Sequence, residues 1–111
     1  MQTVFHVSTP EDVRVVVAKV RNLLADETVE MESVAVVSDR GEAIAELHAG
    51  AELADDLRGL LGDGVALKAC RNAAQHPAVS ETDLLDGVEV VSSGVGELTR
   101  LQDAGYAYIR L

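Results

Sequence analysis

The sequence is short of the residues on which several common kinds of protein depend. Cys70 is the single cysteine, so no internal disulfide can form, and one thiol with three scattered histidines offers no zinc-ligand spacing. No apolar run exceeds a few residues, and no basic stretch leads into an apolar segment near residue 1, so we expect neither a membrane span nor a signal peptide. These shortages predict a cytoplasmic protein without a metal site.

Basic residues are also scarce. Nineteen acidic residues against nine basic ones give a formal charge of −10, which repels phosphate backbones and anionic lipid head groups. We therefore expect no nucleic-acid partner and no membrane surface as a partner. Lys19 and Lys68 are the two lysines, and an acidic, lysine-poor surface is typical of a halophilic habitat, where salt screens the charges.

The residues that are present form alternating strand-like and helix-like patterns along one domain, residues 1–111. Thr9 and Pro10 mark the start of a helix over residues 10–25, because Thr is a good N-cap and Pro suits the first helical position. β-branched and apolar runs predict strands at 4–7, 34–37, 65–69, 88–91 and 106–111. Periodic apolar residues predict further helices near 43–47, 53–61 and 95–105, and residues 71–75 can start a helix that Pro77 must stop.

This alternation predicts the α/β class, with a five-stranded, mostly parallel sheet between two layers of helices. Such a three-layer α/β/α arrangement resembles the flavodoxin-like fold. Short right-handed connections favour a sheet in which the first strand lies between the second and the third, followed by the fourth and fifth.

Cys70 stands out among the residues at the carboxyl ends of these strands, where reactive groups gather in parallel sheets. A thiol at a strand end that enters a helix is near the positive end of the helix dipole, and Arg71 adds a cation, so both favour the thiolate. The alternative is that Cys70 is packed and inert, since free cysteine is among the most buried residue types.

Four segments carry a resemblance to a known family: residues 67–73 (LKACRNA), 84–91 (LLDGVEVV), 94–98 (GVGEL) and 101–109 (LQDAGYAYI). They resemble the strand, cysteine and closing pattern of DsrE/DsrF-like (YchN-like) sulfur-relay proteins, over nearly the whole chain. The resemblance implies a compact three-layer domain, usually assembled into trimers or hexamers. It also implies that Cys70 carries sulfur as a persulfide between donor and acceptor proteins.

Three further residues are candidates for the site around Cys70. Arg71 and Asn72 follow it directly and are the candidate substrate-binding residues. In the expected strand order the first and third strands are neighbours about 5 Å apart, so His6 would lie near Cys70 and share its proton. Otherwise His6 faces the opposite side of the sheet and is structural.

Two functions therefore compete at this point. The first is a sulfur carrier or sulfurtransferase that works through Cys70 and His6 without a cofactor. The second is a non-catalytic oligomeric binding module with a structural cysteine. The glycine pairs Gly62/Gly64 and Gly94/Gly96 complete no phosphate-binding motif, so they are interpreted as turns and helix starts.

Overall fold

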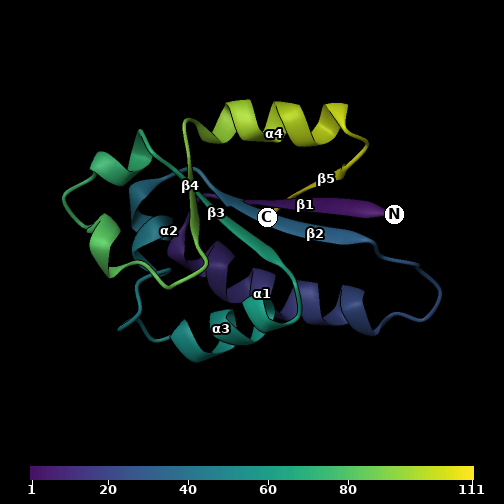
Figure 1. Ribbon diagram of the computed structural model, residues 1–111. Helices are drawn as coiled ribbons and strands as arrows, with labels where there is room; N and C mark the ends of the chain where they lie inside the picture. Colours follow the sequence, from purple (N-terminus) through teal and green to yellow (C-terminus); the bar gives the residue numbers. More distant parts are fainter.

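Five parallel strands form the centre of the computed structural model, which describes all 111 residues (Figure 1). The strands are β1 (Gln2–Val7), β2 (Ser33–Ser38), β3 (Ala66–Cys70), β4 (Glu89–Val91) and β5 (Ala107–Arg110). The helices are α1 (Pro10–Ala25), α2 (Gly41–Ala45), α3 (Ala54–Gly62) and α4 (Gly94–Asp103), with short 3₁₀ turns η1 (Ala73–Gln75) and η2 (Glu81–Asp83). The expected α/β class and its parallel sheet are confirmed.

The strand order is β4-β3-β2-β1-β5, so the order predicted from the sequence is wrong. β1 pairs with β2 and β5, and β3 is separated from β1 by β2. The physical reason is that α1, α2 and α3 all lie on one face, so the right-handed winding continues in one direction from β1 to β4. The chain then returns through α4, on the other face, and adds β5 to the free edge of β1.

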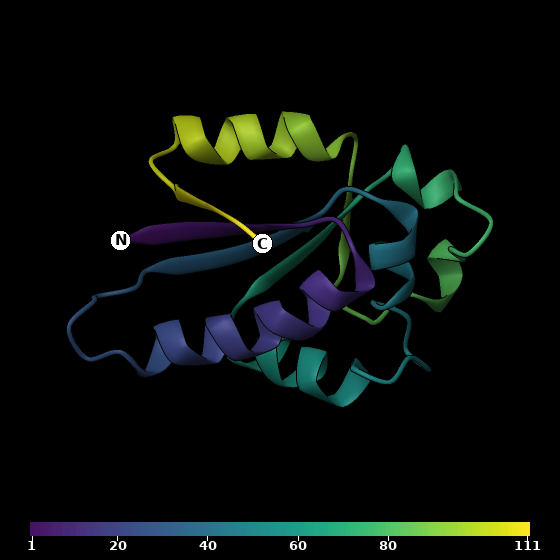
Figure 2. The ribbon, with the colours of Figure 1, turned by 180° about the vertical axis from the view of Figure 1, so that it is seen from behind.

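The two faces of the sheet are covered unequally (Figure 2). The face under α1, α2 and α3 holds a cluster of 20 buried residues, including Phe5, Val16, Ile44 and Leu57. The face under α4 holds a cluster of four: Val4, Ala35, Val37 and Leu98. The molecule is therefore a three-layer α/β/α arrangement whose second helical layer is a single helix.

Local signals explain the start of the longest helix. The Thr9 side chain accepts a hydrogen bond from the Asp12 backbone N–H, and Asp12 in turn accepts one from the Thr9 N–H. This reciprocal capping satisfies two of the N–H groups that a helix start leaves without partners. α1 begins and ends at the predicted residues, and none of the helices is both long enough and apolar enough to cross a lipid bilayer.

The segment after Cys70 differs from its prediction. The helix expected over 71–75 is only the three-residue turn η1, because five residues before Pro77 leave no room for successive α-helical turns. The helix dipole that the sequence assigned to this segment is therefore absent directly after Cys70.

Candidate functional site

The carboxyl ends of the strands bring the polar residues of the sequence to one edge of the sheet. Val37 is paired with His6 on one side and with Lys68 on the other, so these side chains share the α4 face. Two residues farther along each strand, Ser8, Asp39 and Cys70 continue the same row. We call the edge that they occupy the Cys70 rim.

Cys70 is the last residue of β3 and is almost buried, with 7% of its surface exposed. Its side chain packs at the margin of the larger apolar cluster. An ideal Cβ built on Gly94, the first residue of α4, would lie 3.5 Å from the Cys70 Cβ and 3.0 Å from the Asp39 Cβ. The N-terminus of α4, not the segment after Cys70, is therefore the helix start beside the thiol.

The absence of a side chain at Gly94 is what allows this close approach. Ser93 caps α4, because its Oγ accepts a hydrogen bond of 3.1 Å from the Gly96 N–H. The N–H groups of Gly94 and Val95 are in the first turn, where a helix offers them no carbonyl partner. The partial positive charge of these groups favours negative charge on a neighbouring sulfur.

Asp39 is the carboxylate of the Cys70 rim. Ser8 Oγ donates a hydrogen bond of 2.6 Å to Asp39 Oδ1, and His6 Nε2 lies 2.7 Å from Asp39 Oδ2. Burial raises the pKa of Asp39, but the hydrogen bond from Ser8, the contact with His6 and the charge of Arg110 outweigh it, so the pKa is lowered. Asp39 is therefore ionised at neutral pH.

His6 connects the rim to the edge strand β5. Its Nδ1 lies 2.7 Å from the Tyr108 hydroxyl, and the two rings are tilted at 53°. The Nε2–Asp39 contact is close, but the ring N–H does not point along it, so it is an electrostatic contact without an aligned hydrogen bond. His6 thus bridges Asp39 and Tyr108.

The expected adjacency of His6 and Cys70 is wrong, because β2 lies between their strands. Two strand spacings amount to roughly 10 Å, beyond the reach of a shared proton. Both residues nevertheless belong to the α4 face, and Asp39 lies between them. The contact of His6 on the Cys70 side of the rim is the one with Asp39.

The two candidate substrate-binding residues lie at the surface directly after Cys70. The Arg71 backbone N–H donates to Val91 O at 2.8 Å, which fixes the chain between β3 and β4, and its side chain is exposed. Asn72 precedes η1 and makes no side-chain cap hydrogen bond. Both side chains are free to meet a ligand, and their binding role stays a prediction.

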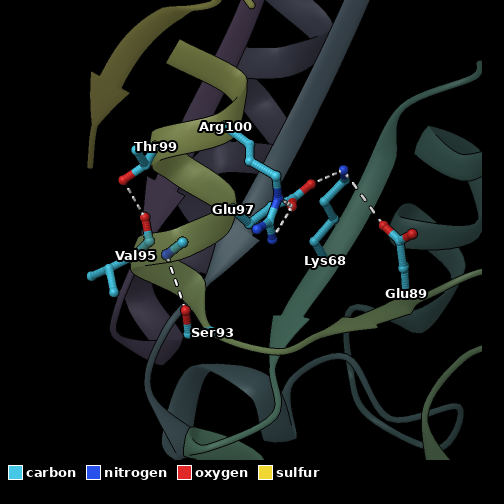
Figure 3. A network of polar contacts seen from close by, with 8 residues as sticks. Lys68, Glu89, Ser93, Val95, Glu97, Thr99 and Arg100 are labelled. Carbon is cyan, nitrogen blue, oxygen red and sulfur yellow. Dashed lines mark hydrogen bonds and ion pairs between the residues drawn. The ribbon is translucent and has the colours of Figure 1, made fainter. Parts of the chain in front are cut away.

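A group of charged residues holds α4 on the sheet close to this site (Figure 3). The Lys68 ammonium of β3 donates to the Glu97 carboxylate of α4 and lies 3.4 Å from Glu89 of β4. Arg100 donates to the same Glu97 through two nitrogens, at 3.0 and 2.8 Å. We call Lys68, Glu89, Glu97 and Arg100 the α4 clamp.

The largest hollow of the molecule lies away from the Cys70 rim. It has a volume of about 900 Å³ and is open to solvent between the α2–α3 connection and η2. Its lining includes His48, Arg58, Asp83 and Leu84, and none of the rim residues. No group of three or more histidines, cysteines and acids is arranged to hold a metal ion. Cys70 therefore lies outside this hollow.

Comparison with known proteins decides the family. The model of the DsrE/DsrF-like family matches residues 20–111. The chain belongs to the DsrE/DsrF-like family. This confirms the resemblance carried by the segment around Cys70 and by the closing segments of the chain.

Two solved structures share the fold of this DsrE/DsrF-like chain. The protein of unknown function MTH1491 from Methanobacterium thermoautotrophicum is 37% identical, with a TM-score of 0.88, and the match covers 99% of this chain and 98% of that one. The ychN protein from E. coli is 18% identical with a TM-score of 0.71, and each chain is covered to 100%. No curated protein matches the chain.

Sequence reasoning missed two parts of the site. Tyr108 is 102 residues from His6 along the chain, and only the docking of β5 against β1 brings them together. The N-terminus of α4 crosses back over Cys70 because the return to β5 passes over the sheet. The signals that could have found it were Ser93, a good N-cap, and Gly94, where a close approach needs a missing side chain.

Proposed function

We propose that this DsrE/DsrF-like protein is a sulfur carrier that holds sulfane sulfur as a persulfide on Cys70. The observation that carries the proposal is the place of the one cysteine: it ends β3 beneath the N-terminus of α4, with Arg71 next in the chain. A helix N-terminus and a cation both favour a sulfur anion. Membership of a family implicated in sulfur relay supports the same chemistry.

The reaction consists of two thiol exchanges that balance without an added oxidant. The Cys70 thiolate attacks the outer sulfur of a donor persulfide R–S–SH, an S–S bond forms on Cys70, and the donor leaves as the thiolate R–S⁻. An acceptor thiolate then attacks the outer sulfur of the Cys70 persulfide, takes it over, and releases the Cys70 thiolate. Each step depends on access to the thiol and on stabilising a sulfur anion.

Two other residues of the rim have supporting roles in this proposal. His6 acts on Cys70 through Asp39, because the contact of its Nε2 with Oδ2 fixes the position of a carboxylate whose negative charge disfavours the thiolate. Asn72 offers an exposed amide to the sulfur compound, next to Arg71. We expect the carrier to work in the cytosol, where thiols are kept reduced.

We also propose a homotrimer or homohexamer as the working form. The support is the uncovered edge strand β5, where the consecutive apolar residues Tyr108 and Ile109, one on each face of the sheet, each expose 42% of their surface. Grouped apolar exposure of this kind marks an association surface. Light scattering at working salt is expected to give three or six protomers, and a monomer would refute this part of the proposal.

Alkylation separates the carrier from the alternative, a binding module with a packed cysteine. The native protein is treated with iodoacetamide at neutral pH, and the intact mass is compared with that of the chain treated in urea. A carrier is alkylated in both states. A Cys70 that is protected in the native state and reacts only after unfolding favours the module.

A further inference from the structure

The arginines of this protein fall into two groups. Arg14, Arg21, Arg58 and Arg100 each form an ion pair with a carboxylate. The remaining three arginines form none, although the chain has nineteen acidic residues against nine basic ones. These are Arg40, Arg71 and Arg110, and all three side chains are exposed.

The three unpaired arginines lie at the same edge of the sheet. Arg40 comes two residues after the end of β2, Arg71 directly follows β3, and Arg110 is the last residue of β5. All five strands are parallel, so these positions share the carboxyl edge with Cys70. Apart from Lys19 on α1, the cationic side chains that form no ion pair are thus gathered at the edge of the sheet that holds the thiol.

No carboxylate forms an ion pair with these arginines, although the charge of Arg110 helps to lower the pKa of Asp39 and of Asp12. Asp39 is engaged by Ser8 and His6, and Asp12 accepts the backbone N–H groups of Ser8 and Thr9. The N–H groups at the start of α4 add partial positive charge beside Cys70. The guanidinium groups remain available to an anion from outside.

We propose that Arg40, Arg71 and Arg110 form an electropositive rim that makes Cys70 selective for negatively charged sulfur donors and acceptors. This rests on the proposed carrier function of Cys70. The thiolates that enter and leave in that function are anions, and the net charge of −10 repels them from the rest of the surface. A local cluster of unpaired arginines attracts them to the one place where sulfur exchange occurs.

Two alkylating reagents of different charge measure this selectivity. Iodoacetate is an anion and iodoacetamide is neutral, and both form a thioether with the same thiolate. The rate constant of iodoacetate is divided by that of iodoacetamide, for native Cys70 and for the chain unfolded in urea. The native ratio divided by the unfolded ratio reports the electrostatic potential at the thiol. We expect this normalised ratio to be about three or more, and we expect it to fall toward one as added salt screens the arginines.

Arginine variants identify the source of the potential. Replacing Arg40, Arg71 and Arg110 by Gln is expected to bring the ratio below one, because the net charge then repels iodoacetate. The matched control replaces three ion-paired arginines, Arg14, Arg21 and Arg58, by Gln and keeps the native ratio. A native ratio at or below one, or an equal fall in the control, overturns the proposal.

Different results would contradict the arginine rim and the carrier function. A Cys70 that neither reagent reaches contradicts the carrier function. The rim is then tested by the melting temperature in sulfate and in chloride at equal ionic strength. Sulfate is expected to raise it more in the native protein than in the triple arginine variant, and an equal rise in both overturns the rim, because general salt exclusion acts on both alike.

Alkylation by charged and uncharged peptides distinguishes a small donor from a protein donor. Arg71 and Arg110 end strands that are three strand spacings apart, roughly 15 Å, so a small anion meets part of the rim and a polypeptide spans it. Bromoacetylated peptides with flanking glutamates are compared with glutamine versions. If Cys70 prefers the glutamate peptide more strongly than it prefers iodoacetate, the donor is a protein. An equal preference indicates a small donor, and a preference for the glutamine peptide overturns the rim.

Discussion

Glu97→Gln tests how firmly α4 is held over the Cys70 rim. Glu97 and Lys68 expose only 10% and 14% of their side chains, so the substitution leaves an almost buried ammonium without its main partner. Removing one member of a fully buried pair costs about 3–5 kcal/mol, and exposed pairs contribute less than about 1 kcal/mol. Because Lys68 keeps Glu89 at 3.4 Å, we expect a loss of about 2 kcal/mol in the free energy of unfolding.

Urea unfolding followed by circular dichroism measures this loss at fixed protomer concentration. A loss of about 2 kcal/mol corresponds to a melting temperature lower by about 8 °C for a chain of this size. The control is Arg58→Gln, which breaks an ion pair with the fully exposed Asp55 carboxylate and is expected to change stability by less than about 0.5 kcal/mol. A Glu97→Gln variant as stable as this control would refute the reasoning.

The same pair predicts a dependence on pH. The hydrogen bond from Lys68 lowers the pKa of Glu97 below its ordinary 4.5, so this contribution is present above pH 4.5 and is lost as the pH falls through the lowered value. Burial lowers the pKa of Lys68, but Glu97 and Glu89 raise it above 10.5, so its contribution is lost only as the pH rises through that raised value. The difference between wild type and Glu97→Gln is therefore largest between pH 4.5 and 10.5.

Three more predictions follow from other parts of the molecule. Ser38→Ala is expected to raise the free energy of unfolding by about 1 kcal/mol in urea titrations, because its fully buried Oγ has no partner; a loss would contradict this. Lowering the salt concentration is expected to lower the melting temperature, since the acids repel when screening weakens; indifference to salt would remove the halophilic interpretation. His6→Ala is expected to slow Cys70 alkylation several-fold at neutral pH, because Asp39 loses its compensating contact; equal rates would make His6 purely structural.

The elements of this fold could be predicted where the signal is local. Thr9, Pro10 and Asp12 define the start of α1 within four residues, so capping chemistry alone places it. The strand order could not be predicted in this way, because β3 is added beside β2 instead of β1, and β5 pairs with β1 only after α4 has crossed the whole sheet. Which free edge receives the last strand depends on packing between distant segments.

The residues of the site also differ in whether a local signal in the sequence could place them. Cys70 ends β3 and Asp39 follows β2, and any parallel sheet brings such residues to one edge, so their place at that edge was readable from the sequence, but their adjacency was not. The distance of His6 from Cys70 depends on strand order and was therefore predicted wrongly. The contact of Tyr108 with His6 needs β5 beside β1 and has no local signal.

Loading and release of sulfur on Cys70 test the central claim most directly. The native protein is incubated with a small-molecule persulfide, its intact mass is measured, and an acceptor thiol is then added. We expect a mass gain of one sulfur atom in wild type, none in Cys70→Ser, and return to the starting mass with the acceptor. A native protein that gains no sulfur, while the chain unfolded in urea does, would contradict it and leave Cys70 as a packed residue of the core.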